Sequence, residues 1–178
     1  MHFFEHYNEN IVKYDLINKF RYKNLIDIPK LRFISLRFNL KKYDLKQLIS
    51  ALAALELITF QKGSLLTSKV SSVSLKIRKG QPVGCKVVLR RDKMLQFLTK
   101  LVNKIIIENK EVKQLTTLNY NLFSFKISNI LIFNELEKNY QFFKNLKNLD
   151  ISIATTPTDF ESFLFLLKSY KIKIRKQM

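Results

Sequence analysis

The stretch KIRKGQPVGCKVVLR, from Lys76 to Arg90, decides the expected fold of this chain. Apolar and polar residues alternate on both sides of its central KGQPVG, as they do in strands with one buried face. The two glycines permit backbone angles that other residues avoid, and the proline between them fixes one torsion. We therefore expect two strands over Val70–Arg90, joined by a turn at Lys79–Gly84.

One face of this expected hairpin is apolar and the other is basic. Period-2 alternation places the apolar side chains of both strands together: Val73, Leu75, Ile77, Cys85, Val87 and Leu89. The opposite face carries four cations: Lys76, Arg78, Lys86 and Arg90. No carboxylate occurs between Ser71 and Arg91. Because like charges this close destabilise a sheet unless phosphates neutralise them, we expect a nucleic-acid-binding face. An ordinary solvated sheet face is the alternative.

The rest of the chain mixes helical and strand patterns. Helices are expected at about 8–20, 44–58 and 92–107 and from Thr158 onward, and strands at 30–38, 121–133 and 149–155. This order predicts an α+β fold, with a largely antiparallel sheet and helices packed on one face. No linker divides the chain, so residues 1–178 are expected to form a single domain with a basic C-terminal tail, KIKIRKQM.

Local signals refine these helices. Asp44 with Gln47, and Thr158 with Glu161, resemble capping boxes at the starts of two helices. The expected buried face of the 44–58 helix follows the 3-and-4 spacing: Leu45, Leu48, Ile49, Leu52 and Leu55. Five phenylalanines are expected in the core rather than stacked on bases: Phe123, Phe125, Phe133, Phe142 and Phe143.

The charge of the chain points to a polyanionic partner. Lys and Arg number 32 against 14 Asp and Glu, a net charge of 32 − 14 = +18. A compact domain with this excess repels itself unless the charge is neutralised. Nucleic acid, an anionic membrane surface and a merely basic solvated surface are the three interpretations. No apolar stretch is long enough to span a bilayer, so membrane insertion is not expected.

Catalytic and metal chemistry find little support. His2 and His6 are the only histidines and Cys85 the only cysteine, so a zinc site lacks ligands and no internal disulfide can form. A buried Cys85 is the simpler interpretation than a Cys–His nucleophile pair. No phosphate-binding loop of the G-x-x-x-x-G-K-[ST] type is present. We expect no enzyme, no catalytic residue, no metal and no cofactor.

Taken together, these residues resemble the bacterial-type ribosomal protein L-five family. The most specific match is LKIRKGQPVGCKVVLR, Leu75–Arg90, against a family pattern close to F-K-I-R-x-G-x-P-I-G-C-K-V-T-L-R. Further matches occur in order along nearly the whole chain: His6-Tyr7, Ile28-Pro29-Lys30, Gln61-Lys62, Asn119-Tyr120, Ile132-Phe133 and Leu149–Thr156. The resemblance implies a structural rRNA-binding protein of the large subunit, in the central protuberance.

The resemblance also implies partners and sites. The partners are 5S rRNA or other large-subunit rRNA, P-site tRNA, the small-subunit head protein S-thirteen and neighbouring central-protuberance proteins. The tRNA-facing turn is expected at Arg78, Lys79, Gly80 and Gln81. The intersubunit contact is expected at Tyr140, Lys144 and Lys147. The rRNA contacts are expected at Arg37, Gln61, Lys62, Lys69, Lys76, Lys86 and Arg90.

Departures from the family pattern put the identity of the RNA in doubt. Arg37 stands where the family has a 5S-contacting asparagine, and Val88 stands for a threonine. Charge is kept while hydrogen-bonding groups are lost, so a divergent 5S rRNA, or rRNA that replaced it, is expected. An RNA chaperone or translation regulator acting outside the ribosome is the alternative function.

The composition also bears on the compartment. Lys, Asn, Ile, Phe and Leu are abundant, a bias that an AT-rich coding genome would produce. This bias, and a family match that begins almost at residue 1, favour an organelle-encoded protein of a mitochondrial ribosome in the matrix. A cleaved presequence, a plastid and a reduced bacterium are the alternatives.

Overall fold

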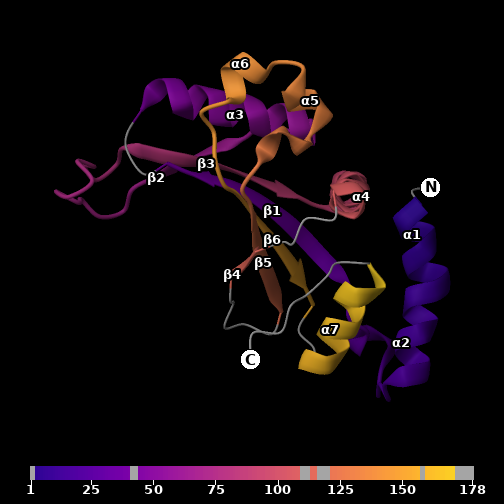
Figure 1. The fold of residues 1–178 in the computed structure, drawn as a ribbon. Helices are drawn as coiled ribbons and strands as arrows, with labels where there is room; N and C mark the ends of the chain where they lie inside the picture. Colours follow the sequence, from indigo (N-terminus) through magenta and orange to yellow (C-terminus); the bar gives the residue numbers. More distant parts are fainter. Residues whose placement is uncertain (1–2, 41–43, 109–112, 116–120, 157–158, 171–178) are drawn as a thin grey trace. The chain divides into compact units, whose positions relative to one another are not determined.

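The computed structural model describes residues 3–40, 44–108, 113–115, 121–156 and 159–170, with the backbone alone for residues 5, 105–108 and 113–115. The basic tail, Asn119-Tyr120 and the Thr158 capping position lie outside the described residues. The protein has the expected α+β fold, with a largely antiparallel sheet and helices (Figure 1).

Six strands form the sheet, in the order β2-β3-β1-β6-β5-β4. Their bounds are β1 Leu31–Asn39, β2 Ser64–Thr67, β3 Pro82–Leu89, β4 Lys113–Leu115, β5 Leu122–Ile127 and β6 Leu149–Thr155. The α-helices are α1 Phe3–Tyr7, α2 Lys13–Lys19, α3 Leu45–Thr59, α4 Arg91–Glu108, α5 Asn134–Glu137, α6 Tyr140–Phe143 and α7 Phe160–Ser169. A π-helix at Asn8–Val12 joins α1 to α2, and 3-10 turns occupy Leu25–Asp27 and Ile130–Ile132.

The chain divides into two compact units. Unit 1 comprises Met1–Ile34, Arg90–Phe125 and Ser152–Met178, and unit 2 comprises Ser35–Leu89 and Lys126–Ile151. Of the residues expected to contact RNA, tRNA or the small subunit, only Arg90 falls in unit 1.

Unit 1 holds its terminal helices through aromatic side chains. The Tyr170 hydroxyl donates to Asn8 Oδ1 at 2.8 Å, and the Tyr7 hydroxyl donates to the Ser169 carbonyl at 3.2 Å. Tyr170 is fully buried, and this burial raises the pKa of its hydroxyl. The long-range pairing fixes the N-terminal helix against α7.

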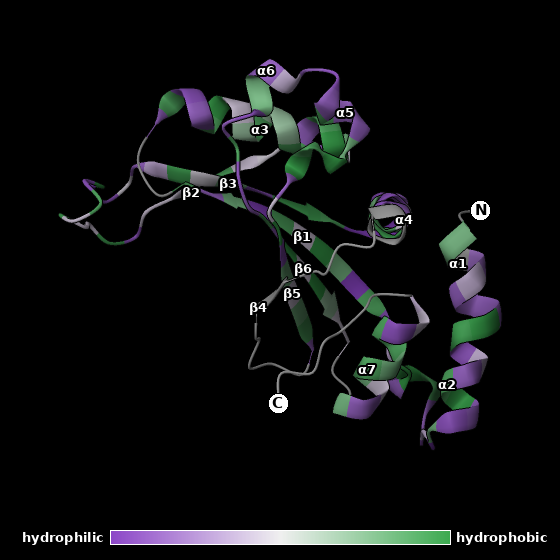
Figure 2. Cartoon of the chain, viewed as in Figure 1, coloured by the Kyte–Doolittle hydropathy of each residue, from purple (hydrophilic) through white to green (hydrophobic). Residues whose placement is uncertain are grey.

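Unit 2 builds its core between α3 and the strands that α3 covers. The buried side chains include Leu36, Phe38, Leu48, Leu55, Cys85 and Val87. Hydrophobic segments of α3, β1 and β3 are visible in Figure 2. Leu52 and Val87 both approach Gly63, so α3 lies on the face of β3 that carries Val87.

Helix α3 confirms the expected span but buries a different face. Leu48, Ala51, Leu55 and Ile58 are buried, whereas Leu45 and Ile49 are exposed, which corrects the expected face. The helix has apolar residues on several sides, so tertiary packing selects the face, and the small Ala51 permits close approach to the sheet. Asp44 caps the helix by accepting from the Lys46 N–H at 3.0 Å.

The expected hairpin is only half correct. A strand follows the turn, but β3 begins at Pro82, inside the expected Lys79–Gly84 turn. Its antiparallel partner is β2, Ser64–Thr67, and no strand covers Val70–Arg78. That segment belongs to a loop, Ser68–Gln81, so the alternation within it does not create an apolar face. Ile77 is buried, but Val73 is 94% exposed and Leu75 is also exposed. Because no neighbouring strand pairs with this serine-rich segment, its backbone hydrogen bonds form within the loop.

Other expectations need smaller corrections. The 30–38, 92–107 and 149–155 elements are confirmed as β1, α4 and β6. The first helical segment begins earlier than expected, at Phe3, and the 121–133 strand ends at Ile127. Four of the five phenylalanines are buried, but Phe142 is 71% exposed. None of the helices in the described parts of the chain is long and apolar enough to cross a bilayer.

Candidate nucleic-acid interface

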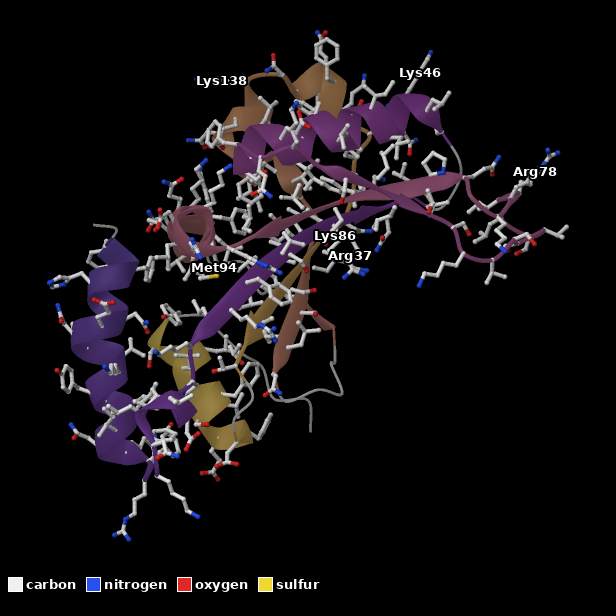
Figure 3. The ribbon with its side chains drawn as sticks, turned by 180° about the vertical axis from the view of Figure 1, so that it is seen from behind. Arg37, Lys46, Arg78, Lys86, Met94 and Lys138 are labelled. Atoms are coloured by element: carbon white, nitrogen blue, oxygen red, sulfur yellow. The ribbon has the colours of Figure 1, made fainter. Side chains whose placement is uncertain are left out.

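The Ser68–Gln81 loop is closed at its base by two backbone hydrogen bonds. The Ser68 N–H donates to the Gln81 carbonyl at 2.9 Å, and the Gly80 N–H donates to the Ser68 carbonyl at 2.9 Å. The loop continues past the β2–β3 pair, and Figure 3 shows Arg78 at its outer part. Because these bonds fix its base, the loop begins and ends at a defined place next to β2 and β3.

The expected tRNA-facing turn, Arg78–Gln81, is held by its own residues. The Gln81 N–H donates to the Arg78 carbonyl at 3.2 Å, which closes a four-residue turn. Gly80 has φ +86°, the left-handed conformation that glycine adopts without strain. The Gln81 Oε1 accepts from the Arg78 N–H at 2.8 Å. Gln81 therefore shapes the turn, while the Arg78 and Lys79 side chains are exposed.

A miniature hairpin forms the remainder of the loop. Ser72 and Ile77 exchange backbone hydrogen bonds at 2.9 and 3.0 Å, and Lys76 between them has φ +54°. Lys69 and Lys76 are exposed, so both are accessible to a polyanion. The structure places Lys76 in this loop and Lys86 on β3, so the four cations expected on one strand face do not share one.

The sheet face away from α3 carries polar and cationic side chains, among them Arg37 and Lys86. We call this face of β1 and β3 the open face. The Leu40 N–H donates to the Val83 carbonyl at 2.9 Å, and Phe38 hydrogen-bonds to the Cys85 thiol. Counting along these paired strands places Arg37 opposite Lys86, and Lys86 in turn pairs with Ser64 of β2. Opposed residues of paired strands point to the same face. Figure 3 labels Arg37 and Lys86 close to each other near β1 and β3.

The strands of the open face approach closely because Gly84 has no side chain. A Cβ on Gly84 would collide with the Phe38 carbonyl oxygen. Gly84 is therefore required by strand packing, not by the turn that the sequence pattern suggested. The same close approach brings Arg37 and Lys86 together.

The carboxylate of Asp150 also belongs to unit 2 and is already engaged. The Asn39 Nδ2 donates to Asp150 Oδ2 at 2.8 Å, and Lys126 Nζ lies 3.5 Å from Asp150 Oδ1. Within the described residues, no ion pair joins Arg37 or Lys86 to a carboxylate. Sequence reasoning missed the Asn39–Asp150–Lys126 group, because it depends on contacts between distant strands. The open face therefore keeps a positive charge for an external anion.

Three further expected rRNA contacts lie next to β2 and β3 along the chain. Gln61 is half-buried, and its Nε2 donates to the Val88 carbonyl at 3.2 Å, which leaves its oxygen as an acceptor. Lys62 is exposed beside it. Arg90 is exposed just after β3 and belongs to unit 1.

The expected intersubunit residues lie on and after α6. Tyr140, Lys144 and Lys147 are all exposed, and the Lys144 N–H donates to the Tyr140 carbonyl at 2.9 Å. Phe142 adds an exposed aromatic ring at a position where the sequence predicts a core residue. Exposed aromatic side chains are enriched at protein-binding surfaces.

The single cysteine of the chain lies in the core. Cys85 is buried, and this burial raises the pKa of its thiol to about 12, partly offset by its hydrogen bond with Phe38. The reactive thiolate is therefore disfavoured. In the same parts of the chain, no cluster of His, Cys, Asp and Glu has the composition of a metal site.

Comparison with known proteins agrees with this architecture. Residues 82–174 match the family model for the C-terminus of ribosomal L-five proteins. The chain is 34% identical to large ribosomal subunit protein uL5m of Reclinomonas americana, over 97% of both chains. It is 34% identical to uL5 of Geotalea uraniireducens over 96% of this chain and 97% of the relative, and 33% identical to uL5 of Wigglesworthia glossinidia brevipalpis over 99% of this chain and 100% of the relative. The chain therefore belongs to the ribosomal protein uL5 family.

Proposed function

We propose that this protein is a structural component of the large ribosomal subunit and is not an enzyme. In this proposal it binds 5S rRNA, or the rRNA that replaces it, in the central protuberance, beside other proteins of that region. The observation that carries the proposal is the Arg37–Lys86 pair on the open face, because neither cation has a carboxylate partner among the described residues. Two uncompensated cations at adjacent strand positions suit the closely spaced phosphates of RNA.

Several neighbouring groups support this binding face. Gln61 and Lys62 follow α3, while Lys69 and Lys76 extend the positive charge into the loop. No carboxylate occurs between Glu56 and Asp92. Arg90 completes the set of expected rRNA contacts. This long acid-free segment favours a polyanion over an ordinary solvated surface.

The turn at Arg78–Gln81 is proposed to contact P-site tRNA. Its support is that Arg78 and Lys79 are exposed on a turn whose conformation is set by Gly80 and Gln81. A preorganised turn loses little conformational entropy when it binds.

The surface of Tyr140, Lys144 and Lys147 is proposed to contact the head protein S-thirteen of the small subunit. The exposure of Phe142 beside these residues supports a protein partner. Aromatic rings supply much of the binding energy at such surfaces.

A mitochondrial ribosome is the proposed location, and its support is the similarity to the uL5m relative of Reclinomonas americana. The organelle-encoded origin belongs to the same proposal. Fractionation of lysed organelles on a sucrose gradient tests it. Co-sedimentation with large-subunit rRNA is expected, whereas a protein found only with mRNA would favour the regulator that acts outside the ribosome.

Salt titration of 5S rRNA binding tests the open face directly. We expect log Kd to change steeply with log salt, by about 0.7–0.9 per phosphate neutralised. The double variant Arg37→Ala/Lys86→Ala should reduce that slope by roughly two such increments. Lys46→Ala, an exposed cation on α3 (Figure 3), is the matched control and should leave the slope unchanged. A wild-type affinity that does not depend on salt would contradict the proposal.

A further inference from the structure

A cleft of about 320 Å³ opens within unit 2, where β1 ends, α3 begins and the chain approaches β6. Phe38, Leu40 and Leu146 contribute apolar surface, and Asn39, Gln47, Asn145, Lys147 and Asn148 contribute polar groups. The Asn39 amide is already bonded to Asp150. None of the amide-bearing residues was singled out as a binding residue by the sequence. Its volume is at the lower end of the range for small-ligand sites, about 300–1,000 Å³.

The apolar part of the cleft is rigid. Phe38 is buried on β1, and Leu146 is buried after α6, where its N–H donates to the Phe143 carbonyl at 3.0 Å. Both side chains belong to the packed core of unit 2. Leu40, which is partly exposed, adds apolar surface to this lining.

The polar part of the cleft has unused hydrogen-bonding capacity. Among the described residues, no hydrogen bond joins the side-chain amides of Gln47, Asn145 or Asn148 to another protein group. Each amide offers two donor hydrogens and one acceptor oxygen. A ligand that presents both donors and acceptors at its edge matches these groups.

Two of these residues have a defined backbone position. Gln47 lies in the first turn of α3, next to Lys46, whose N–H is capped by Asp44. Asn148 immediately precedes β6 and has φ +60°, a left-handed conformation that asparagine tolerates better than most residues. The cleft thus presents its amides from a capped helix and from the start of a strand.

We propose that this cleft binds a single unpaired base of the RNA, with the amides on its edge and Lys147 near its phosphate. The inference rests on the proposed RNA-binding function and adds base selectivity to it. Unpaired bases are the usual targets of sequence-specific RNA recognition, and asparagine and glutamine amides pair with base edges. The exposed cation and the net charge of +18 favour a nucleotide over a peptide.

Two RNA hairpins of equal length test this inference. One is fully paired, and the other carries a single bulged nucleotide, prepared in turn as A, C, G and U. Affinity is measured by fluorescence anisotropy at a fixed salt concentration. We expect at least one bulged hairpin to bind the wild-type protein about tenfold more tightly than the paired hairpin.

A triple variant then locates the selectivity. Gln47→Ala/Asn145→Ala/Asn148→Gly removes the three amides, and glycine keeps the left-handed backbone at position 148. Lys147 is left unchanged, because it also belongs to the proposed intersubunit surface. Gln141→Ala removes an exposed amide of α6 that does not line the cleft and is the matched control. Thermal denaturation checks that every variant is folded.

The outcomes separate this inference from the proposed function. Loss of the preference in the triple variant, with unchanged affinity for the paired hairpin and a normal Gln141→Ala control, supports the cleft. Equal wild-type affinity for paired and bulged hairpins overturns the cleft but not RNA binding. A preference that survives in the triple variant also overturns it. A folded wild-type protein that binds neither hairpin overturns the cleft, and one that also fails to bind 5S rRNA overturns the proposed function itself.

Discussion

The open face and the Ser68–Gln81 loop are both basic, but they are held in different ways. On the open face, strand pairing and the close approach at Gly84 fix the positions of Arg37 and Lys86. In the loop, local hydrogen bonds fix the backbone, and the side chains of Arg78 and Lys79 remain exposed. A rigid face suits permanent attachment to RNA, whereas an exposed turn suits a ligand that arrives and leaves.

Gly84→Ala tests whether close strand packing fixes the open face, and it should have the largest effect. Its Cβ would meet the Phe38 carbonyl oxygen, which belongs to a paired strand and cannot rotate away. We expect a loss of about 3 kcal/mol in the free energy of unfolding, the upper part of the range for overpacking. Urea denaturation followed by circular dichroism measures it. Stability equal to that of the wild type would show that the strands separate easily.

Arg78→Glu should separate the roles of loop and sheet. Reversing this exposed charge is expected to weaken tRNA binding by the assembled ribosome about tenfold, or about 1.4 kcal/mol. Incorporation of the protein into the large subunit should remain normal, as shown by quantitative mass spectrometry of purified subunits. Lys46→Glu on α3 is the matched charge reversal. A variant that fails to enter the subunit would identify the turn as an rRNA contact.

Gly80→Ala should strain the turn without disturbing the sheet. A Cβ here meets open space, but the φ of +86° disfavours any L-residue, so we expect a cost of about 1 kcal/mol. Chemical-denaturation measurements on Gly80→Ala and Gly80→Asn should rank asparagine as the milder change. If alanine costs as much at position 80 as at 84, the loop and the sheet are not energetically distinct.

Val73→Ser should have the smallest effect, below about 0.5 kcal/mol, because this side chain is almost fully exposed. Ile77→Ser is the informative partner, since Ile77 is buried within the same loop and its loss should be clearly measurable. Thermal unfolding of the two variants compares them. Equal costs would imply that Val73 packs against the protein in solution.

The sequence predicts elements well where pattern and pairing agree. β1, α4 and β6 were found from alternation or helical spacing, and Gly80 was correctly assigned to a turn. The pattern failed at Val70–Arg78, because alternation describes a side-chain order but not the presence of a neighbouring strand. It also failed at Phe142, since hydrophobicity alone does not distinguish a core position from a binding surface.

Part of the candidate site can likewise be predicted from the sequence, and part cannot. The cations of the loop and of β3 were visible as charges in the sequence. The opposition of Arg37 and Lys86 was not, because it depends on the register between β1 and β3. The amides around the cleft belong to separate elements, and no local pattern relates Gln47 to Asn145.

The hydrogen bonds between Ser68 and the Gly80–Gln81 backbone have a consequence for how this protein can change. They bring the two ends of the loop to one point, so the chain length between them is largely independent of the strands. We expect that extra residues can be inserted near Val73 at a small entropic cost, and that a fluorophore can be attached at this exposed position. The reach of the loop can therefore evolve, or be engineered, while the sheet that anchors it stays the same.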